Sequence, residues 1–145
     1  MLILPLVVSA QIPCNTTAKF RVIGDGPNIF STSNNRLNLL SYDSITQSLL
    51  FIHRANPLVS GGNSSDLRYD LSVDTGNTWV VNKGVLNPTN TNSNGARYPQ
   101  VVNHHPSGSS SINNNYALYY APTVGTTWNG YVSGVRKLDN SVNTE

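Results

Sequence analysis

The stretch Ser72-Val73-Asp74-Thr75-Gly76-Asn77-Thr78-Trp79 decides the fold class of this chain of 145 residues. Its residue types are those of a tight hairpin turn. An aspartate at the mouth of such a turn accepts hydrogen bonds from backbone N–H groups, and Gly76 takes a positive φ angle without a Cβ clash. Thr78 returns the chain to strand geometry, and Trp79 leaves the turn as a large apolar anchor. The sequence therefore predicts a β-hairpin at this position.

Strand-like segments lie on both sides of this turn at short intervals. They cover residues 37–42, 48–54, 66–73, 78–82, 96–103, 115–121 and 127–135. Each segment is short, apolar or alternating, and bounded by Gly, Asn, Pro or Ser residues, which is typical of strands joined by turns. No stretch carries a sustained helical spacing of apolar residues with caps. We therefore expect an all-β fold with very little helix.

The eight residues match the pattern S-x-D-x-G-x-T-W at every specified position. The hairpin thereby resembles the Asp-box (BNR) repeat of sialidases and many other secreted β-propellers. In those proteins the motif is structural and lies on the turn between the outer strands of a blade, away from the catalytic face. The resemblance implies a structural role for Ser72, Asp74, Gly76, Thr78 and Trp79. It makes Asp74 a hydrogen-bond acceptor within the turn rather than a catalytic acid.

A degenerate copy of the motif follows at residues 121–128. Gly125-Thr126-Thr127-Trp128 repeats Gly76-Asn77-Thr78-Trp79, and the two tryptophans are 49 positions apart. This spacing is close to the roughly 40 to 50 residues of one propeller blade. Ala121 and Thr123 stand where the serine and the aspartate of the motif belong, so the copy lacks the acidic acceptor. The repeat predicts a partial β-propeller of about two blades of antiparallel strands.

A wider resemblance covers most of residues 37–140. Ala96 to Gln100, Tyr116 to Pro122 and Trp128 to Val132 follow the hairpin in order. This order is similar to that of surface or secreted propeller proteins exported by the type IX secretion system, which are usually several times longer and end in a sorting domain. A closed propeller typically needs about four to eight blades. The resemblance therefore implies that residues 37–145 form an incomplete β-propeller, the N-terminal fragment of a longer protein.

The N-terminus predicts a secreted or cell-surface location. Leu2 to Val8 is a short apolar run, and Val8-Ser9-Ala10 offers the small residues of a signal-peptidase site. We interpret residues 1–10 as a truncated signal peptide that precedes a polar segment at 11–36. No Lys or Arg stands before the apolar run, which leaves a buried N-terminal strand as the alternative.

Composition argues against nucleic-acid binding and against a transmembrane segment. Charged residues are 11% of the chain, against roughly 25% in a typical soluble domain. The nine Lys and Arg residues are scattered and the net charge is +2, whereas a nucleic-acid groove needs a basic stripe that releases counterions from phosphates. No apolar run approaches the roughly 20 residues of a transmembrane helix. We expect neither a nucleic-acid partner nor a transmembrane segment.

The tyrosines supply a candidate binding surface. Tyr116, Tyr119 and Tyr120, with Trp128 and Tyr131 across the next turn, form an aromatic group able to stack on sugar rings. Strand alternation turns half of these side chains toward the core, so packing between blades is the alternative interpretation. Glycans or surface proteins are the expected partners.

Residues that typically bind metals are sparse. Asp66, Asp70 and Asp74 recur every fourth residue on one strand face, but calcium sites use denser oxygen ligation, so we interpret them as exposed polar positions. His104 and His105 point to opposite faces of an extended strand. We expect no metal and no cofactor.

Cys14 is the only cysteine, so the chain forms no intrachain disulfide and has no cysteine zinc cluster. Pro13 directly precedes it, where a lipoprotein site needs a small residue, so a free or buried thiol is the preferred interpretation.

The sequence favours a non-catalytic propeller segment with a structural or binding role. The alternative is the N-terminal part of a sialidase-like glycoside hydrolase, which would need an arginine triad, a tyrosine with its glutamate and an acidic proton donor. Phe20-Arg21-Val22-Ile23 is faintly similar to the F-R-I-P motif that supplies the first arginine, but it lacks the proline. Glu145 is the sole glutamate, at the end of the chain. No catalytic residue is assigned.

Overall fold

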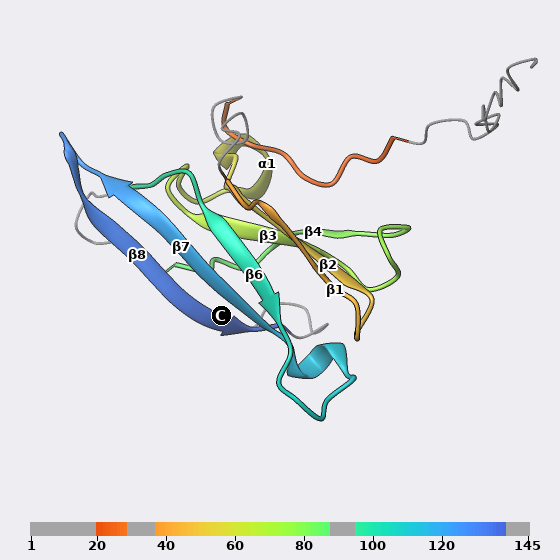
Figure 1. The fold of residues 1–145 in the computed structure, drawn as a ribbon. Coiled ribbons are helices and arrows are strands. Elements are labelled where there is room, and N and C mark those ends of the chain that lie inside the picture. The colour runs from red at the N-terminus through yellow and green to blue at the C-terminus, as the bar shows by residue number, and fades with distance from the viewer. Residues whose placement is uncertain (1–19, 29–36, 88–94, 139–145) are drawn as a thin grey trace, which may run out of the picture.

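The alternating segments form two antiparallel sheets in a computed structural model that describes residues 20–28, 37–87 and 95–138. Figure 1 shows the sheets packed face to face. The first sheet has the order β1-β2-β3-β4, with β1 Leu40–Asp43, β2 Ser48–Arg54, β3 Leu67–Ser72 and β4 Val80–Lys83. The second sheet contains β5 Gly95–Ala96, β6 Gln100–His104, β7 Tyr116–Val124 and β8 Trp128–Lys137. In it, β5 and β6 both pair with one edge of β7, and β8 pairs with the other.

The prediction of an all-β fold with very little helix is confirmed. The only helical pieces among the described residues are α1 Pro57–Ser60 and η2 Ile112–Asn114. Helix α1 was not expected from the apolar pattern, and its cause is local. The Asn56 side chain accepts a hydrogen bond from Leu58 N at 3.2 Å, and Pro57 begins the first turn with a φ angle already suited to a helix.

The core lies between the two sheets. Alternation along each strand turns one set of apolar side chains inward. The first sheet contributes Leu50, Ile52, Leu67, Tyr69 and Leu71, and the second contributes Val101, Ala117, Tyr119 and Ala121. The Tyr119 hydroxyl donates a hydrogen bond to the Leu86 carbonyl at 2.7 Å, which satisfies its polar end within the core.

Strand β6 is the part of the second sheet that lies against β1 and β2. Val101 N donates to the Asn38 carbonyl and Asn103 N to the Ser41 hydroxyl, each at 2.9 Å. These bonds use N–H groups of β6 that would otherwise be unpaired. They fix the position of the second sheet on the first.

The turn at 72–79 and its degenerate copy lie at opposite ends of the strands (Figure 1). The 72–79 turn contacts the β1–β2 turn, because Thr75 N donates to the Gln47 carbonyl at 3.1 Å. The copy joins β7 to β8, so Trp128 begins the third strand of its meander, whereas Trp79 precedes the fourth. The two turns, whose tryptophans are 49 positions apart, therefore do not occupy equivalent places in the two sheets.

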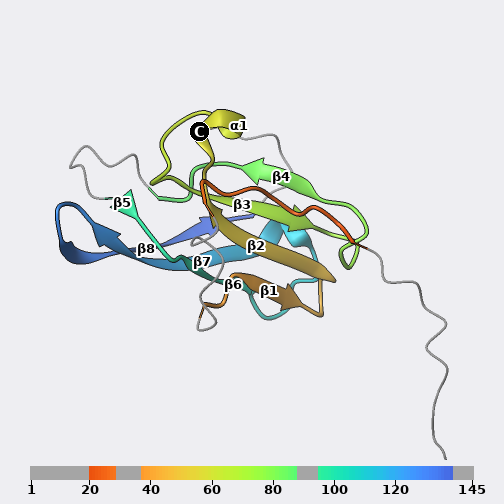
Figure 2. The same cartoon turned by 90° about the horizontal axis from the view of Figure 1, so that it is seen from above.

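An extended segment, residues 20–27, runs along the outward side of the first sheet (Figure 2). A Cβ atom at Gly24 would overlap the Asp70 carboxylate and would lie 3.5 Å from the Phe51 ring. Glycine therefore lets this segment approach β2 and β3 closely. Within the same segment, Phe20 and Val22 are exposed. The predicted signal peptide and Cys14 lie outside the described residues.

Gly134→Ala should destabilise the fold because its Cβ would overlap the phenol ring of Tyr119. Inserting a methyl group into a filled site costs about 1–3 kcal/mol. Urea unfolding measures the change, and Ser133→Ala, an exposed neighbour on β8, is the matched control. Equal stability of the two variants would contradict the close packing of β8 on Tyr119.

Candidate functional site

The carboxylate of Asp74 organises the 72–79 turn from within. Its Oδ1 accepts from Thr78 N at 2.9 Å and from the Ser72 hydroxyl at 2.8 Å, and its Oδ2 accepts from the Thr78 hydroxyl at 2.6 Å. Ser72 Oγ in turn accepts from Gly76 N at 2.8 Å. Both carboxylate oxygens are therefore engaged inside the turn.

Two residues of this turn have left-handed backbone geometry. Gly76 has a φ angle of 90°, as the hairpin pattern predicts, and Thr75 has a φ angle of 58°. A non-glycine residue in this region is uncommon. The bond from Thr75 N to Gln47 and the short bond from the Thr75 hydroxyl to the Asp74 carbonyl, 2.6 Å, hold Thr75 there.

Trp79 packs on the turn and is only half-buried. Its indole N–H donates to the Gly76 carbonyl at 3.1 Å. Trp79 was expected to be a large apolar anchor, but its side chain only partly covers the turn. The reason is that Trp79 stands between the turn and β4, at the edge of the first sheet, where no further strand of the described residues covers it.

Hydrogen bonds lower the pKa of Asp74 to about 2. The Thr78 hydroxyl makes the largest contribution, followed by Thr78 N and the Ser72 hydroxyl. A carboxyl group with this pKa is ionised at neutral pH and holds its hydrogen bonds as an acceptor. It is a poor proton donor under those conditions.

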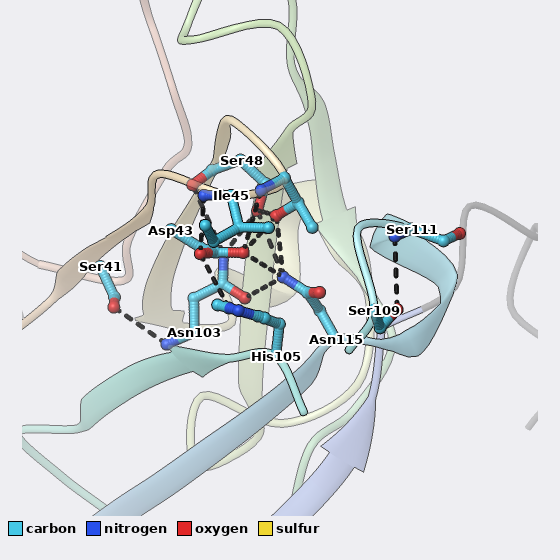
Figure 3. A network of polar contacts seen from close by, with 10 residues as sticks. Ser41, Asp43, Ile45, Ser48, Asn103, His105, Ser109, Ser111 and Asn115 are labelled. Carbon is cyan, nitrogen blue, oxygen red and sulfur yellow. Dashed lines mark hydrogen bonds and ion pairs between the residues drawn. The ribbon is translucent and has the colours of Figure 1, made fainter. Parts of the chain in front are cut away.

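A second polar cluster ties the two sheets together at the β1–β2 turn (Figure 3). The buried Asn115 Nδ2 lies 3.0 Å from each of three acceptors, Asp43 Oδ2, Thr46 Oγ1 and Asn103 Oδ1. Asn103 Nδ2 donates to the Ser48 hydroxyl at 2.7 Å. The cluster therefore joins β1 and β2 to the ends of β6 and β7.

Asp43 and His105 form a partly exposed pair in this cluster, with His105 Nδ1 2.9 Å from Asp43 Oδ1. Burial acts to raise the pKa of Asp43, but hydrogen bonds from Thr46, Asn115 and Ile45 N lower it to about 2. An aspartate that orients a histidine is part of the catalytic triad of hydrolases. Among the described residues, however, no serine, threonine or cysteine side chain is hydrogen-bonded to the other ring nitrogen of His105, so no nucleophile completes a triad.

A third pair, His53 and Asp70, is fully buried beneath the 20–27 segment. His53 Nε2 lies 3.2 Å from Asp70 Oδ2, and its Nδ1 lies 2.9 Å from the Arg54 carbonyl. The carbonyl only accepts, so Nδ1 carries a proton. Nε2 makes no well-aligned hydrogen bond, but the negative charge of the nearby Asp70 carboxylate favours a proton there too, and therefore the charged imidazolium.

The buried Asp70 corrects the expectation that Asp66, Asp70 and Asp74 are exposed positions on one strand face. Asp70 is 0% exposed and Asp66 is 9% exposed. Asp66 precedes β3 and accepts from Asn63 N at 2.8 Å, whereas Asp74 lies in the turn. The three carboxylates therefore serve three separate local structures. The segment over Asp70 comes from a distant part of the chain, which the strand pattern does not reveal.

The predicted aromatic group is divided between the two sides of the second sheet. Tyr119 is buried in the core, and Tyr116 is half-buried near the start of β7. Tyr120, Trp128 and Tyr131 are exposed on the opposite side. There Tyr120 stacks on Tyr131, with ring centroids 5.5 Å apart.

Sequence reasoning missed Tyr98, a half-buried residue that adjoins the exposed aromatic group. Tyr98 stacks on Trp128 with ring centroids 5.8 Å apart. The sequence predicts one strand over 96–103, whereas the structure divides it into β5 and β6. Tyr98 lies in the connection between them, where strand alternation does not give the direction of a side chain. A shallow hollow adjoins the same side of the sheet and is lined by residues that include Gln100, Leu118 and Tyr120.

Asp74→Asn should lower the midpoint of thermal unfolding at pH 7, because an amide offers one accepting oxygen where the carboxylate offers two. The folded-state pKa is lowered, so the stabilisation is present above the ordinary value of 3.8 and is lost as the pH falls toward about 2. The gap between variant and parent should therefore shrink between pH 4 and pH 2. Thr126→Ala, in the exposed β7–β8 turn, is the control, and a gap that stays constant with pH would refute the role of the charge.

The His53–Asp70 pair should make stability depend on pH above 6.5. Burial alone would lower the pKa of His53, but its contact with Asp70 and the negative charge of Asp70 outweigh burial and raise that pKa above 6.5. The stabilisation is then complete below pH 6.5 and is lost as the pH rises through the folded-state pKa. Urea unfolding between pH 5.5 and 9 measures this loss. The double variant His53→Gln/Asp70→Asn should show a flatter profile, and an unchanged slope would contradict the ion pair.

Two further observations concern membrane-spanning helices and metal sites. No helix in the described ranges is both long and apolar enough to cross a membrane. Across the same ranges, no three His, Cys, Asp or Glu side chains gather where they could hold a metal ion. Comparisons of the chain with protein-family models, with curated proteins and with solved structures found no match.

Proposed function

We propose that this chain is a non-catalytic segment of a secreted or cell-surface β-propeller, with a structural and binding role. The observation that carries the proposal is the 72–79 turn. It joins the third and fourth strands of a four-stranded antiparallel meander, and both oxygens of Asp74 are engaged within it. This position and this use of the aspartate are what the resemblance to the Asp-box implies, and they support the proposal.

The arrangement of the two sheets supports the same proposal. Each propeller blade is a small antiparallel sheet that packs face to face on its neighbours. Here β6 lies against β1 and β2, and the cluster around Asn115 ties the two sheets at that point. In this proposal the first sheet is one blade and the second sheet is the next.

The ionisable groups of the described residues favour a non-catalytic role. A general acid works best with a pKa near the working pH, whereas Asp43 and Asp74 both have pKa values of about 2. His53 and Asp70 are fully buried and bound to each other. The alternative of a sialidase-like hydrolase depends on Arg21, which lies in the extended 20–27 segment and is exposed. No contact of Arg21 favours that alternative.

The binding part of the proposal depends on the exposed aromatic side chains of β7 and β8 and on the half-buried Tyr98 beside them. Tyr120 and Tyr131 form one stacked pair, and Tyr98 and Trp128 form another. Exposed aromatic groups of this kind bury a large area when a partner covers them. They are the expected point of contact with a glycan or a surface protein.

The purified chain should not hydrolyse a fluorogenic sialoside above the buffer rate. Because Asp74 has a structural role in this proposal, Asp74→Asn should alter stability and leave that background rate unchanged. A bacterial sialidase assayed in parallel confirms that the substrate is competent. Turnover that disappears in folded Asp74→Asn or Arg21→Ala protein would overturn the proposal and favour the hydrolase.

A further inference from the structure

Two arginine side chains from different sheets meet at one end of the core. Arg54 ends β2 in the first sheet, and Arg97 follows β5 in the second. Both bind the loop at residues 61–66, between α1 and β3. Arg54 Nε donates to the Ser64 carbonyl at 2.8 Å. Arg97 Nη1 donates to the Ser65 hydroxyl at 3.2 Å, so two adjacent residues of one loop hold the two guanidinium groups close together.

This arginine pair lies at the opposite end of the strands from the cluster around Asn115. Arg54 is the last residue of β2, whereas Ser48, which belongs to that cluster, is the first. Arg97 N donates to the Pro122 carbonyl at 2.9 Å near the end of β7, whereas Asn115 precedes β7. One end of the joint between the sheets is therefore tied by hydrogen bonds. The other end brings two like charges together.

The described residues supply no negative charge to balance this pair. Across residues 20–28, 37–87 and 95–138, no carboxylate forms an ion pair with either guanidinium. Asp66, the acidic residue of the same loop, accepts from Asn63 N at 2.8 Å instead. Arg54 is nevertheless only 7% exposed. A buried cation is normally paired with an opposite charge, because the loss of its hydration is otherwise uncompensated.

Both side chains are positively charged at neutral pH. Burial, and after it the positive charge of Arg97, lowers the pKa of Arg54 to about 10, whereas Tyr98 acts to raise it. A guanidinium with this pKa still carries its proton near pH 7. The two charges therefore repel each other where the sheets meet, and a doubly negative ion between them would replace repulsion by attraction.

The donors of the arginine pair suit an oxyanion. A guanidinium carries five N–H groups in a planar fork that matches two oxygens of a sulfate or phosphate group. The hydrogen bonds within the described residues use Arg54 Nε and Arg97 Nη1, which leaves the other nitrogens of both forks as donors. The Ser65 hydroxyl accepts from Arg97 and can donate its own proton. Because Arg97, Ser64 and Ser65 are partly exposed, a small ion can approach over them.

Close packing fixes the Arg97 guanidinium before any ligand binds. A Cβ atom at Gly95 would overlap both Arg97 Nη1 and Ser65 Oγ. The same Nη1 also donates to the Ala96 carbonyl at 2.9 Å. A side chain that is already held loses little freedom on binding, which favours this arginine over a mobile surface arginine as a binding group.

We infer that Arg54 and Arg97 form a binding site for a doubly negative tetrahedral oxyanion, a sulfate or phosphate group, which bridges the two sheets. The group is either a free ion or part of a larger ligand such as a sulfated or phosphorylated sugar. This site goes beyond the proposed function and does not depend on the propeller architecture. The competing explanation is that the arginines only hold the 61–66 loop in place.

Thermal unfolding of the full chain tests the inference, with sodium sulfate or sodium phosphate replacing sodium chloride at constant ionic strength. The concentrations stay in the low millimolar range, below those at which these salts stabilise proteins in general. The unfolding midpoint of the wild-type protein should rise and then saturate, because an ion that binds only the folded state stabilises it.

Two variants separate the site from general charge effects. In Arg97→Gln the affinity for sulfate should fall by about tenfold or more, because charge-assisted hydrogen bonds are lost. Arg136→Gln removes the same charge from an exposed position on β8. It is the matched control and should respond to sulfate like the wild-type protein.

NMR of the wild-type protein gives a second measurement that needs no variant to fold. Titration with sulfate should shift the side-chain Nε–H signals of Arg54 and Arg97 along one saturation curve and leave that of Arg136 in place. A midpoint that rises without saturating, an equal response in wild-type and folded Arg97→Gln protein, or an unchanged Arg54 signal would each overturn the inference.

Inorganic sulfate and glucose 6-sulfate distinguish the two sources of the anion. Tighter binding of the sugar sulfate, lost in Arg97→Gln, supports a site for a group carried by a larger ligand. Equal or weaker binding of the sugar sulfate supports a site for the free ion. If neither compound binds the wild-type protein, the arginines have only the structural role and the inference is wrong.

Discussion

Buried amide groups determine how β6 packs against β1 and β2, and this contact sets the position of every other strand of the second sheet. Asn115 and Asn103 make hydrogen bonds that strands slipped by one residue could not make, because a slip turns every side chain to the other side of its sheet. The Asn115 amide shares two protons among three acceptors at 3.0 Å. An unpaired polar group in this place costs about 1–3 kcal/mol. The cluster therefore selects the one register that directs Tyr119 inward and Tyr120 outward.

The few carboxylates of the described chain are used to hold turns and segments in place. Asp43 and Asp74 accept hydrogen bonds within their turns, and Asp70 pairs with His53 beneath the 20–27 segment. Each of these three carboxylates is held by partners that lie close to it. With charged residues at 11% of the chain, the exposed apolar side chains of β6, β7 and β8 have few charged neighbours.

Local patterns predicted the strands and the main turn well, since both depend on neighbouring residues. The segment 48–54 is β2 as expected. In the turn, Asp74 and Gly76 have the geometry that their residue types favour. What could not be predicted depends on distant parts of the chain. Asp70 looked like an exposed residue because alternation tells which side of a strand a residue occupies, and not whether another segment covers that side. The similarity of the turn at 125–128 to the one at 76–79 likewise hides a difference in strand order.

Free strand edges are a second route by which a β-protein associates, and this chain limits that route more than it limits contact through its faces. Strand β4, at one edge of the first sheet, has four residues, which is too short to template a long pairing. At the edge of the second sheet, β8 ends in Arg136 and Lys137 and contains Gly130 and Gly134, which weaken a pairing strand. The outer side of β7 and β8, where Tyr120, Trp128 and Tyr131 are exposed, has no comparable protection among the described residues. Because β4 and β8 are poor templates for a new strand and the outer side of the second sheet is exposed, contact through that side is favoured over extension of a sheet at these two edges.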